Sequence, residues 1–415
     1  MNQQTNKRKI INDPIYGFVT LPDDFIYELI NHPYFQRLRR IKQLGLTNLV
    51  YPGALHTRFH HAIGAMYLMT EALNVLQSKQ IEITPEEIQA VTIAILLHDI
   101  GHGPFSHALE HAIVQGINHE DISALLMQRL NEQYNGKLTL AIKIFNNEYS
   151  KKFLHQLVSS QLDMDRLDYL RRDSFFTGVS EGVISSDRII KMLNVKNDEL
   201  VIEEKGIYSI EKFIIARRLM YWQVYLHKTV VSAENMLVNI LKRAKELAAK
   251  EVDLFATPAL SIFLKNNFSK KDFSVDATLL DTFALLDDYD IFSAVKVWAQ
   301  HEDKILSTLC ENLVNRKLFK IELTKEKIQE SHKQELIEKA ISVLNINAAD
   351  AHYFVVSGEI ENSAYKTGNV KINILMKDGS MLDIAEASDQ LNVEALSKTV
   401  KKYFICYPKN LIIKK

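Results

Sequence analysis

The segment HDIGHGPFSH, residues 98–107, places three histidines and an aspartate within ten positions, directly after an apolar run. That run, at 88–97, follows the capping-box pattern TPEE at 84–87, and together they predict a helix buried on most sides that ends near Gly101. Imidazole and carboxylate groups left unpaired at the end of a buried helix would be costly. The segment therefore predicts a bound metal ion together with an anionic ligand.

Helical periodicity continues on both sides of this segment. Apolar stripes predict helices at 60–76, at 160–172 and, without interruption, at 210–249. The pattern stays helical from 252 to 340. The sequence therefore predicts a chain that is mainly α.

The pattern changes near residue 350, where short β-rich runs begin. The turn sequence KDGS at 377–380 separates two such runs and predicts a hairpin. The expected domains are a helical core at 1–250, a helical extension at 251–345 and a small C-terminal α+β subdomain at 346–415. The tail elements are expected as strands at 353–356, 372–376, 381–384 and 403–407 and a helix at 392–402.

Length and composition describe an ordinary globular protein. The 415 residues predict two or three domains, and 47% hydrophobic and 24% charged residues are typical of a soluble chain. A net charge of -1 gives no global reason to expect nucleic acid or a membrane as partner. The two cysteines, Cys310 and Cys406, form no metal-binding spacing, and no N-terminal signal core or bilayer-length apolar run is present. We therefore expect a cytoplasmic protein.

Four residues on predicted helices form the strongest chemical pattern: His61, His98, Asp99 and Asp165. Imidazole and carboxylate ligands together suit divalent iron, manganese, zinc or nickel better than calcium. Such a set leaves coordination positions for water and a phosphate oxygen, and the ion would lower the pKa of the bound water.

A second polar cluster is DMDRLDYLRRD, residues 163–173. On a helix, Asp165, Tyr169, Arg172 and Asp173 would share one face. Taken alone, this cluster is equally well explained as a solvated, salt-bridged helix. Beside the histidine segment it is better explained as one metal ligand with contacts to phosphate and sugar.

Beyond these clusters, an ordered set of motifs between residues 10 and 230 resembles a known family. The motifs are INDPIYGFVTL, FQRLRRIKQLG, YPGALHTRFHHAIG, LLHDIGHGPFSH, INHE, DMDRLDYLRRD and VYLHK. They resemble the deoxynucleoside triphosphate (dNTP) triphosphohydrolase branch of the HD-domain phosphohydrolases, which includes the human sterile-alpha-motif and HD-domain dNTPase and bacterial relatives. The resemblance implies an HD-domain helical core and hydrolysis of a dNTP to deoxynucleoside and inorganic triphosphate.

The resemblance also implies a role for each matching residue. His61, His98, Asp99 and Asp165 would bind a divalent metal ion, whether iron, manganese, zinc, nickel or magnesium. His107 would position or activate the attacking water, His102 would contact the α-phosphate, and His119 would be the general acid. The implied substrate contacts are Arg58, Arg166 and Tyr169 at the triphosphate, Gln43, Leu44, Asp173 and Tyr225 at the deoxyribose, and Arg217 near the base.

Two positions depart from the human enzyme at this site. Arg166 replaces a lysine, which keeps the positive charge but exchanges a compact ammonium group for a planar guanidinium group. Tyr221 replaces a histidine near the base, so the resemblance does not define the base contacts.

Relatives of this kind assemble as oligomers and are activated by nucleotides bound between subunits. The resemblance therefore implies a homo-oligomer, a dimer or tetramer, and an activating nucleotide. Asn31 replaces the aspartate with which the human enzyme recognises the edge of guanine, so the resemblance does not extend to guanine-specific activation. Ordinary packing between subunits would explain the residues that match the activator sites equally well. These residues are Lys9, Asn12, Asn31, Gln36, Arg39, Val50 and Lys228.

Two other functions remain open at the level of sequence. One is an HD phosphohydrolase of another nucleotide, such as a guanosine alarmone or a nucleoside monophosphate. The other is a nucleotide- or nucleic-acid-binding protein, because lysines and aromatic residues alternate near the C-terminus and such patches can bind single strands. The residues concerned are Lys398, Lys401, Lys402, Lys409, Lys414, Lys415, Tyr403, Phe404 and Tyr407.

Overall fold

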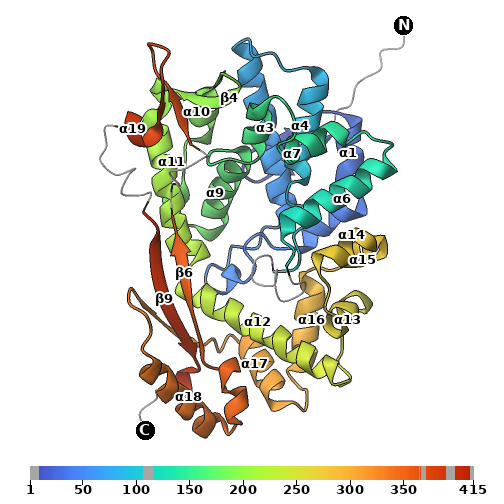
Figure 1. Cartoon of the computed structure of the whole chain (residues 1–415), viewed down its shortest axis with the longest axis vertical. Coiled ribbons are helices and arrows are strands. Elements are labelled where there is room, and N and C mark those ends of the chain that lie inside the picture. Colours follow the sequence, from blue (N-terminus) through green and yellow to red (C-terminus); the bar gives the residue numbers. More distant parts are fainter. Residues whose placement is uncertain (1–8, 106–115, 364, 366–370, 389–397, 412–415) are drawn as a thin grey trace.

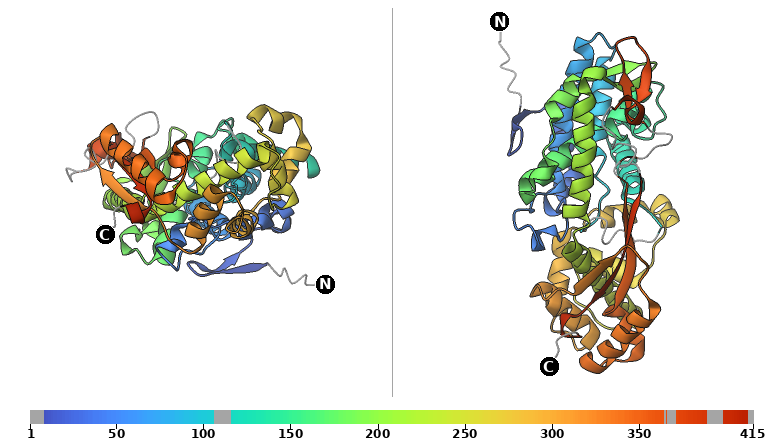
Figure 2. Two further views of the ribbon diagram at one scale, coloured as in Figure 1. Left: turned by 90° about the horizontal axis from the view of Figure 1, so that it is seen from below. Right: turned by 90° about the vertical axis from the view of Figure 1, so that its left-hand side faces the viewer.

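The computed structural model describes residues 9–105, 116–363, 365, 371–388 and 398–411 of the chain. Helices dominate it and the sheets are small, so the fold is mainly α, as predicted (Figure 1). The molecule is elongated, with the helical core at one end and most of the C-terminal elements at the other (Figure 2).

Three helices at the centre of the core position the predicted metal ligands. They are α3 (Arg58–Ser78), α4 (Pro85–Leu97) and α9 (Met164–Thr177), and α3 packs against both of the others. The predicted capping box starts α4, where the Thr84 hydroxyl and the Glu87 carboxylate each accept a hydrogen bond from the other residue's N–H. Because α4 is buried almost all round, its end at Leu97 delivers the following polar residues directly into the interior.

Helix α9 lies four to five residues later than the predicted helix at 160–172. The Asp163 carboxylate caps it by accepting a hydrogen bond from the N–H of Arg166 at 2.7 Å, so the helix begins at Met164. Gly178, with φ of 75°, ends it in the left-handed region that glycine favours. The cap therefore sets which residues of the acidic cluster point into the core.

The expected uninterrupted helix at 210–249 is wrong. The chain forms α11 (Ile207–Met220), a π-helical turn η6 (Tyr221–Tyr225) and then α12 (Lys228–Ala249). The Leu226 N–H bonds the carbonyl of Tyr221, and the His227 side chain caps α12 by accepting from the Thr229 N–H. No glycine or proline marks this break, which is why the apolar pattern alone missed it. Single π turns are frequently found at functional sites.

The remaining core elements surround these helices. An N-terminal hairpin precedes short helices, and a second antiparallel pair lies after α10. In order they are β1 (Ile10–Asp13), β2 (Gly17–Thr20), α1 (Asp24–Asn31), α2 (Pro33–Gln36), η1 (Arg37–Arg40), η2 (Thr47–Leu49), α6 (His119–Gln133), α7 (Thr139–Phe145), α8 (Lys152–Val158), η4 (Ser180–Gly182), α10 (Ser186–Lys191), β3 (Leu193–Lys196), β4 (Glu199–Glu203) and η5 (Glu204–Gly206).

The region after α12 is helical, as predicted, apart from one strand. Its first helices pack beside the core and the later ones lie toward the C-terminal end (Figure 1). They are α13 (Pro258–Lys265), α14 (Lys270–Val275), α15 (Ala277–Phe283), α16 (Asp288–Trp298), α17 (Lys304–Val314), β5 (Lys320–Thr324) and α18 (Glu330–Leu344).

The C-terminal strands join two different sheets. The predicted hairpin is confirmed as β7 (Asn373–Leu375) and β8 (Met381–Asp383), and β7 also pairs in parallel with β4 of the core. The second sheet has the order β5-β9-β6 and is antiparallel, with β6 at Val356–Asn362 and β9 at Val400–Tyr407. Strands from the tail thus pair with strands on the other side of both expected domain boundaries.

Two expectations for the tail are wrong in part. Residues up to Tyr353 form the 3-10 turn η7 (Ala348–Tyr353), and the strand begins only at Val356, because the N–H groups of Phe354 and Val355 still bond the carbonyl of Ala351. The expected helix at 392–402 falls mostly outside the described residues, but 400–402 already belong to β9. Short helices α19 (Ile384–Ala387) and η8 (Lys409–Leu411) complete the tail. Among the described helices, none combines the length and apolarity needed to cross a bilayer.

Candidate active site

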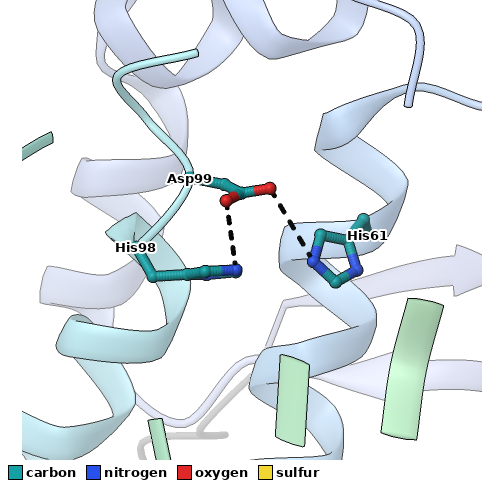
Figure 3. Close-up of side chains that lie close together, drawn as sticks. All are labelled: His61, His98 and Asp99. Atoms are coloured by element: carbon teal, nitrogen blue, oxygen red, sulfur yellow. Dashed lines mark ion pairs between the residues drawn. The ribbon is translucent and has the colours of Figure 1, made fainter. Parts of the chain in front are cut away.

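The four predicted metal ligands meet at the junction of α3, α4 and α9. His61 Nε2 lies 3.0 Å from Asp165 Oδ1 and 3.9 Å from Asp99 Oδ2. His98 Nε2 lies 3.4 Å from Asp99 Oδ1 and 3.6 Å from Asp165 Oδ1. Figure 3 shows the two imidazoles facing the Asp99 carboxylate from different helices.

Hydrogen bonds at the far side of each ring fix its tautomer. His61 donates its Nδ1–H to the Asp168 carboxylate at 2.7 Å, and His98 donates its Nδ1–H to the Ile95 carbonyl at 2.6 Å. Both Nε2 lone pairs therefore point at the shared centre, and neither Nε2 atom has a hydrogen-bond partner of good geometry among the described residues. Two buried imidazole lone pairs beside two carboxylates fit a divalent transition-metal ion.

The electrostatics of the centre favour positive charge. Burial lowers the pKa of His61, but Asp165 and Asp168 outweigh it and raise that pKa to about 10. Burial raises the pKa of Asp165, but the two imidazoles outweigh it and hold that pKa far below its usual range. The site therefore stabilises either a proton or a metal ion between these groups.

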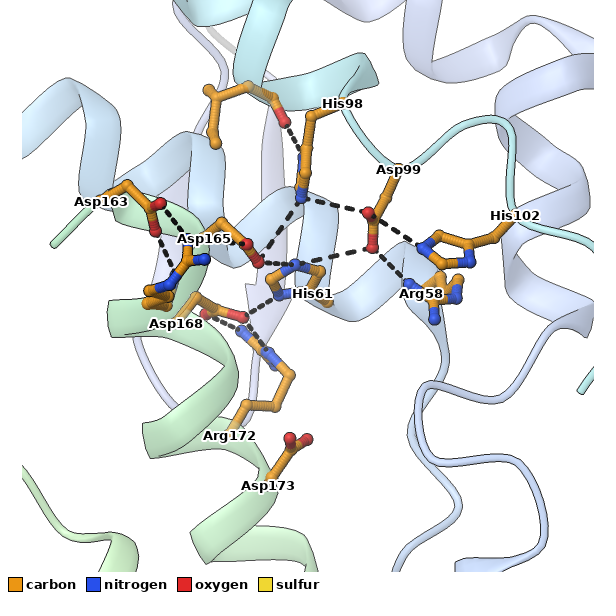
Figure 4. Close-up of polar contacts among 12 residues, drawn as sticks. Arg58, His61, His98, Asp99, His102, Asp163, Asp165, Asp168, Arg172 and Asp173 are labelled. Carbon is orange, nitrogen blue, oxygen red and sulfur yellow. Dashed lines mark hydrogen bonds and ion pairs between the residues drawn. The ribbon is translucent and has the colours of Figure 1, made fainter. Parts of the chain in front are cut away.

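A second group of polar residues adjoins the centre. Arg58 donates to Asp99, and His102 Nε2 lies 3.2 Å from Asp99 Oδ1 (Figure 4). Burial and then Arg58 hold the pKa of His102 well below its usual range, so His102 is neutral at pH 7. The ring of His119 stacks on His102 with centroids 3.8 Å apart.

A close approach between the turn after α4 and α6 brings His119 to this place. Asn118 caps α6 by accepting from the Asp121 N–H at 2.7 Å, and His119 is the first residue of the helix. A Cβ at Gly101 would lie 2.3 Å from the backbone oxygen of His119 and from the backbone nitrogen of Ser123. Glycine at 101 is therefore required for the two histidines to stack.

Asp168 and Arg172 support the centre from behind. Arg172 makes a two-pronged pair with Asp168 at 2.9 Å and also bonds Asp13 at 2.9 Å. A Cβ at Gly64 would lie 2.1 Å from this pair, so only glycine lets α3 pack over it. Arg172 thus serves the buried network and does not share the cavity-facing side of α9 that the helix pattern had assigned to it.

A cavity of about 470 Å³ opens from this candidate metal centre. Its size suits a drug-sized or nucleotide-sized ligand. Eleven of the predicted site residues line it: Gln43, Leu44, Arg58, Asp99, His102, His119, Asp165, Arg166, Tyr169, Asp173 and Tyr225.

The far part of α9 meets η6 within this cavity. Tyr225 donates its hydroxyl to Asp173 Oδ2 at 2.8 Å, and His56 Nε2 contacts Asp173 Oδ1 at 2.7 Å. Burial and then Asp173 hold the pKa of Tyr225 well above its usual range, so the phenol stays neutral. Arg166 is anchored by Asp163 at the start of the helix.

Some predicted site residues lie elsewhere. Arg217 is not among the residues that line the cavity and instead lies 5.9 Å from the ring centroid of Tyr221, which does line it. His107 lies outside the described residues.

The proposed activator residues also lie away from the cavity lining. Lys9 lies over the ring of Tyr27, and the Asn31 amide donates to the carbonyl of the same tyrosine. Arg39 donates to the Gln36 amide oxygen. Asn12 is in β1, Val50 follows η2 and Lys228 begins α12.

Several cavity and support residues were not predicted. His56 and Asp168 stand inside quoted motifs, but only the fold shows that they hold Asp173 and His61. The unpredicted residues that line the cavity are Gly45, Thr47, Phe105, Glu120, Leu226 and Glu234. The break before α12 brings the last two to the cavity, and it left no sequence signal.

Comparison with known proteins defines the class. Residues 58–173 match the HD domain model, and residues 184–274 match the model of the HD associated region. YwfO of Bacillus subtilis is 33% identical over 99% of this chain and 94% of its own length. The chain belongs to the HD-domain family that includes the SAMHD1 deoxynucleoside triphosphate triphosphohydrolases.

Two further relatives place the chain within that family. The crystal structure of a phosphohydrolase from Bacteroides thetaiotaomicron is 57% identical, with a TM-score of 0.94 over 97% of this chain and all of that one. The SAMHD1 homolog of Dictyostelium discoideum, described as a deoxynucleoside triphosphate triphosphohydrolase, is 34% identical over 57% of this chain. The match spans half of the Dictyostelium protein.

Proposed function

We propose that this protein is a metal-dependent dNTP triphosphohydrolase that releases deoxynucleoside and inorganic triphosphate. One observation carries the proposal. The cavity joins a His-Asp metal centre, two arginines and a Tyr–Asp pair in a single space of nucleotide size.

The metal would be held by His61, His98, Asp99 and Asp165, because these are the groups whose lone pairs converge. When bound, a divalent ion polarises a phosphoryl oxygen and lowers the pKa of water. Asp168 and the Ile95 carbonyl accept the Nδ1–H groups of the two imidazoles and so direct their Nε2 atoms at the place where the metal would bind.

The phosphate chain would lie along the cationic part of the cavity. Arg58 and Arg166 line it beside the centre, each already held by an aspartate, so their guanidinium groups are preorganised for phosphate oxygens. Tyr169, one turn further along α9, has a neutral hydroxyl because burial keeps its pKa well above the usual range.

His119 would donate the proton to the departing 5′ oxygen of the deoxynucleoside. It lines the cavity and stacks on His102, which we propose contacts the α-phosphate. A leaving alkoxide needs a proton, and imidazolium is the side-chain acid best matched to neutral pH. His107 keeps its proposed role in positioning the attacking water.

The deoxyribose would lie against the Asp173–Tyr225 pair, with Gln43 and Leu44 opposite. The ring and hydroxyl of Tyr225 are fixed by Asp173, and a fixed aromatic ring packed against C2′ leaves no space for a 2′-hydroxyl. We therefore propose a preference for deoxyribonucleotides.

We further propose that the protein is a homo-oligomer, dimer or tetramer, with an activating nucleotide at the activator residues named above. Support comes from the SAMHD1 relatives and from the placement of these residues outside the cavity. Lys9, Asn31, Gln36 and Arg39 already contact other residues of the same chain, and bound nucleotide would have to compete with those contacts.

A substrate panel tests the proposal. Purified protein with manganese or ferrous iron would be given each dNTP, each ribonucleoside triphosphate, a deoxynucleoside monophosphate and a guanosine alarmone, with and without GTP. We expect turnover of dNTPs only. Turnover restricted to the alarmone or the monophosphate would contradict the proposal.

A further inference from the structure

Glu234 is a carboxyl group of the cavity that the proposed reaction does not use. It lies in the second turn of α12, which crosses below the core in Figure 1, and its side chain lines the same cavity as the metal centre. No described residue donates a hydrogen bond to the Glu234 carboxyl or forms an ion pair with it. Burial alone raises its pKa to about 7, with no contribution from a neighbouring charge.

The other carboxylates that line the cavity differ from Glu234 in this respect. Asp99 and Asp165 face the imidazoles of the metal centre, and Asp173 accepts from Tyr225 and contacts His56. Glu120 is exposed to solvent. Glu234 is half-buried at the cavity wall. A poorly solvated carboxyl without a donor is costly, and a ligand that brings a donor would relieve that cost.

The charge of the proposed substrate decides which part of it meets Glu234. A triphosphate is strongly anionic and belongs beside the metal, Arg58 and Arg166; a carboxylate would repel it. The deoxyribose is assigned to Asp173 and Tyr225. The uncharged base is the part that remains, and it carries N–H donors.

The four bases differ in what they offer a carboxylate. Adenine, cytosine and guanine each carry an exocyclic amino group. Thymine has none, and its one ring N–H is flanked by two carbonyl oxygens that repel an anionic acceptor. When it is ionised, at a pH above its raised pKa, a single carboxylate can therefore separate thymine from the other three bases.

We propose that Glu234 is a specificity-determining residue that accepts a hydrogen bond from the exocyclic amino group of the base, so that the enzyme favours dATP, dCTP and dGTP over dTTP. This inference rests on the proposed function. It assigns to one residue a base contact that the resemblance to the family leaves undefined.

Steady-state kinetics test it at a pH above the raised pKa of Glu234, where the carboxyl is ionised. The four proteins are the wild type, Glu234→Leu, Glu234→Gln and the control Glu246→Gln, a change on the exposed side of the same helix. We expect the wild type to show kcat/KM for dTTP roughly tenfold below the other dNTPs, the worth of one hydrogen bond to a charged group. Glu234→Leu should remove the difference through KM, because the base is remote from the reacting phosphorus. Glu234→Gln, which keeps an oxygen acceptor, should retain part of it, and the control should retain all.

The outcomes separate this inference from the proposed function. Equal use of all four dNTPs by the wild type, or unchanged ratios in Glu234→Leu, would overturn the role of Glu234 while leaving the activity standing. Absence of turnover and of binding for every dNTP, with metal present, would overturn both. Circular dichroism would verify folding. If Glu234→Leu does not fold, the Glu234→Gln variant takes its place, and dNTP ratios in that variant equal to those of the wild type would overturn the role of Glu234.

Discussion

At the scale of single residues, hydrogen bonds within the protein already orient the His98 ring toward the candidate metal centre. Its Nδ1–H is committed to the carbonyl of Ile95, and its Nε2 faces Asp99 and Asp165. The His61 ring is oriented in the same way, because its Nδ1–H is donated to the Asp168 carboxylate. The directions of the two Nε2 atoms at the candidate metal centre are thus fixed by a backbone carbonyl for His98 and by a carboxylate for His61.

A variant that lacks the His98 Nε2 atom should no longer bind the metal. For His98→Ala we predict loss of bound metal, measured by elemental analysis, and loss of dNTP turnover. His155→Ala is the matched control, since that ring, in α8, bonds the backbone carbonyl of Ile144 in α7 and does not line the cavity. Full metal content in His98→Ala would refute the ligand assignment.

His119 should behave differently, because it is proposed to move a proton and lies outside the four-ligand set. His119→Ala should keep the metal and lower kcat roughly 10²- to 10⁴-fold, the usual worth of general acid catalysis. A rate equal to that of the wild type would exclude His119 as the acid. Metal content measured on the same sample distinguishes this result from loss of the ion.

At the scale of elements, Arg37 ties two segments of chain together. This buried side chain in η1 donates to the carbonyls of Ile100 at 2.8 Å, His102 at 2.9 Å and Leu286 at 3.1 Å. Burial lowers its pKa to about 10, so it remains charged at neutral pH. It holds the turn that carries Asp99 and His102 against the connection before α16.

Replacement of Arg37 should therefore weaken both stability and the site. Arg37→Met leaves three buried carbonyls without a donor, and we predict a loss of about 3 kcal/mol or more in the free energy of unfolding. Urea denaturation measures it. Arg40→Met, a change at a half-exposed neighbour that pairs with Asp287, should cost far less. Equal stabilities of the two variants would contradict this account of Arg37.

Elements were predictable where their signals are local. The capping box before α4 and the turn at 377–380 are such signals, and both elements formed as expected. The π turn between α11 and α12 depends on tertiary contacts, which an apolar stripe does not encode. For the same reason the sequence predicted the residues that meet at the candidate metal centre but not Glu234, whose place in the cavity depends on that break.

At the scale of the whole molecule, strands and side chains of the C-terminal tail, from residue 346 on, contact the helical core. β7 extends the sheet of β3 and β4, and Asn239 of α12 donates to the carbonyl of Tyr353 at 2.9 Å. The rings of Phe404 and Tyr407 are buried, and Lys402 lies over Trp222. Rings packed in this way cannot stack on nucleic-acid bases, which disfavours the single-strand-binding alternative. The domain boundaries and the cytoplasmic location stay predictions.

A truncation tests how far the tail supports the rest. A chain of residues 1–345 lacks β6 to β9 and leaves β4 and β5 with unpaired edges. We predict a lower Tm and reduced solubility compared with the full chain, measured by differential scanning calorimetry. A truncated protein with the same Tm would show that the tail is an independent domain.

Product analysis tests the central claim most directly. The metal-loaded protein would be incubated with dATP, with GTP added as activator, and the phosphorus products followed by ³¹P NMR while the nucleoside is identified by chromatography. The account predicts deoxyadenosine and intact inorganic triphosphate in equal amounts. Release of orthophosphate or pyrophosphate, or no product at all from protein with verified metal, would contradict it.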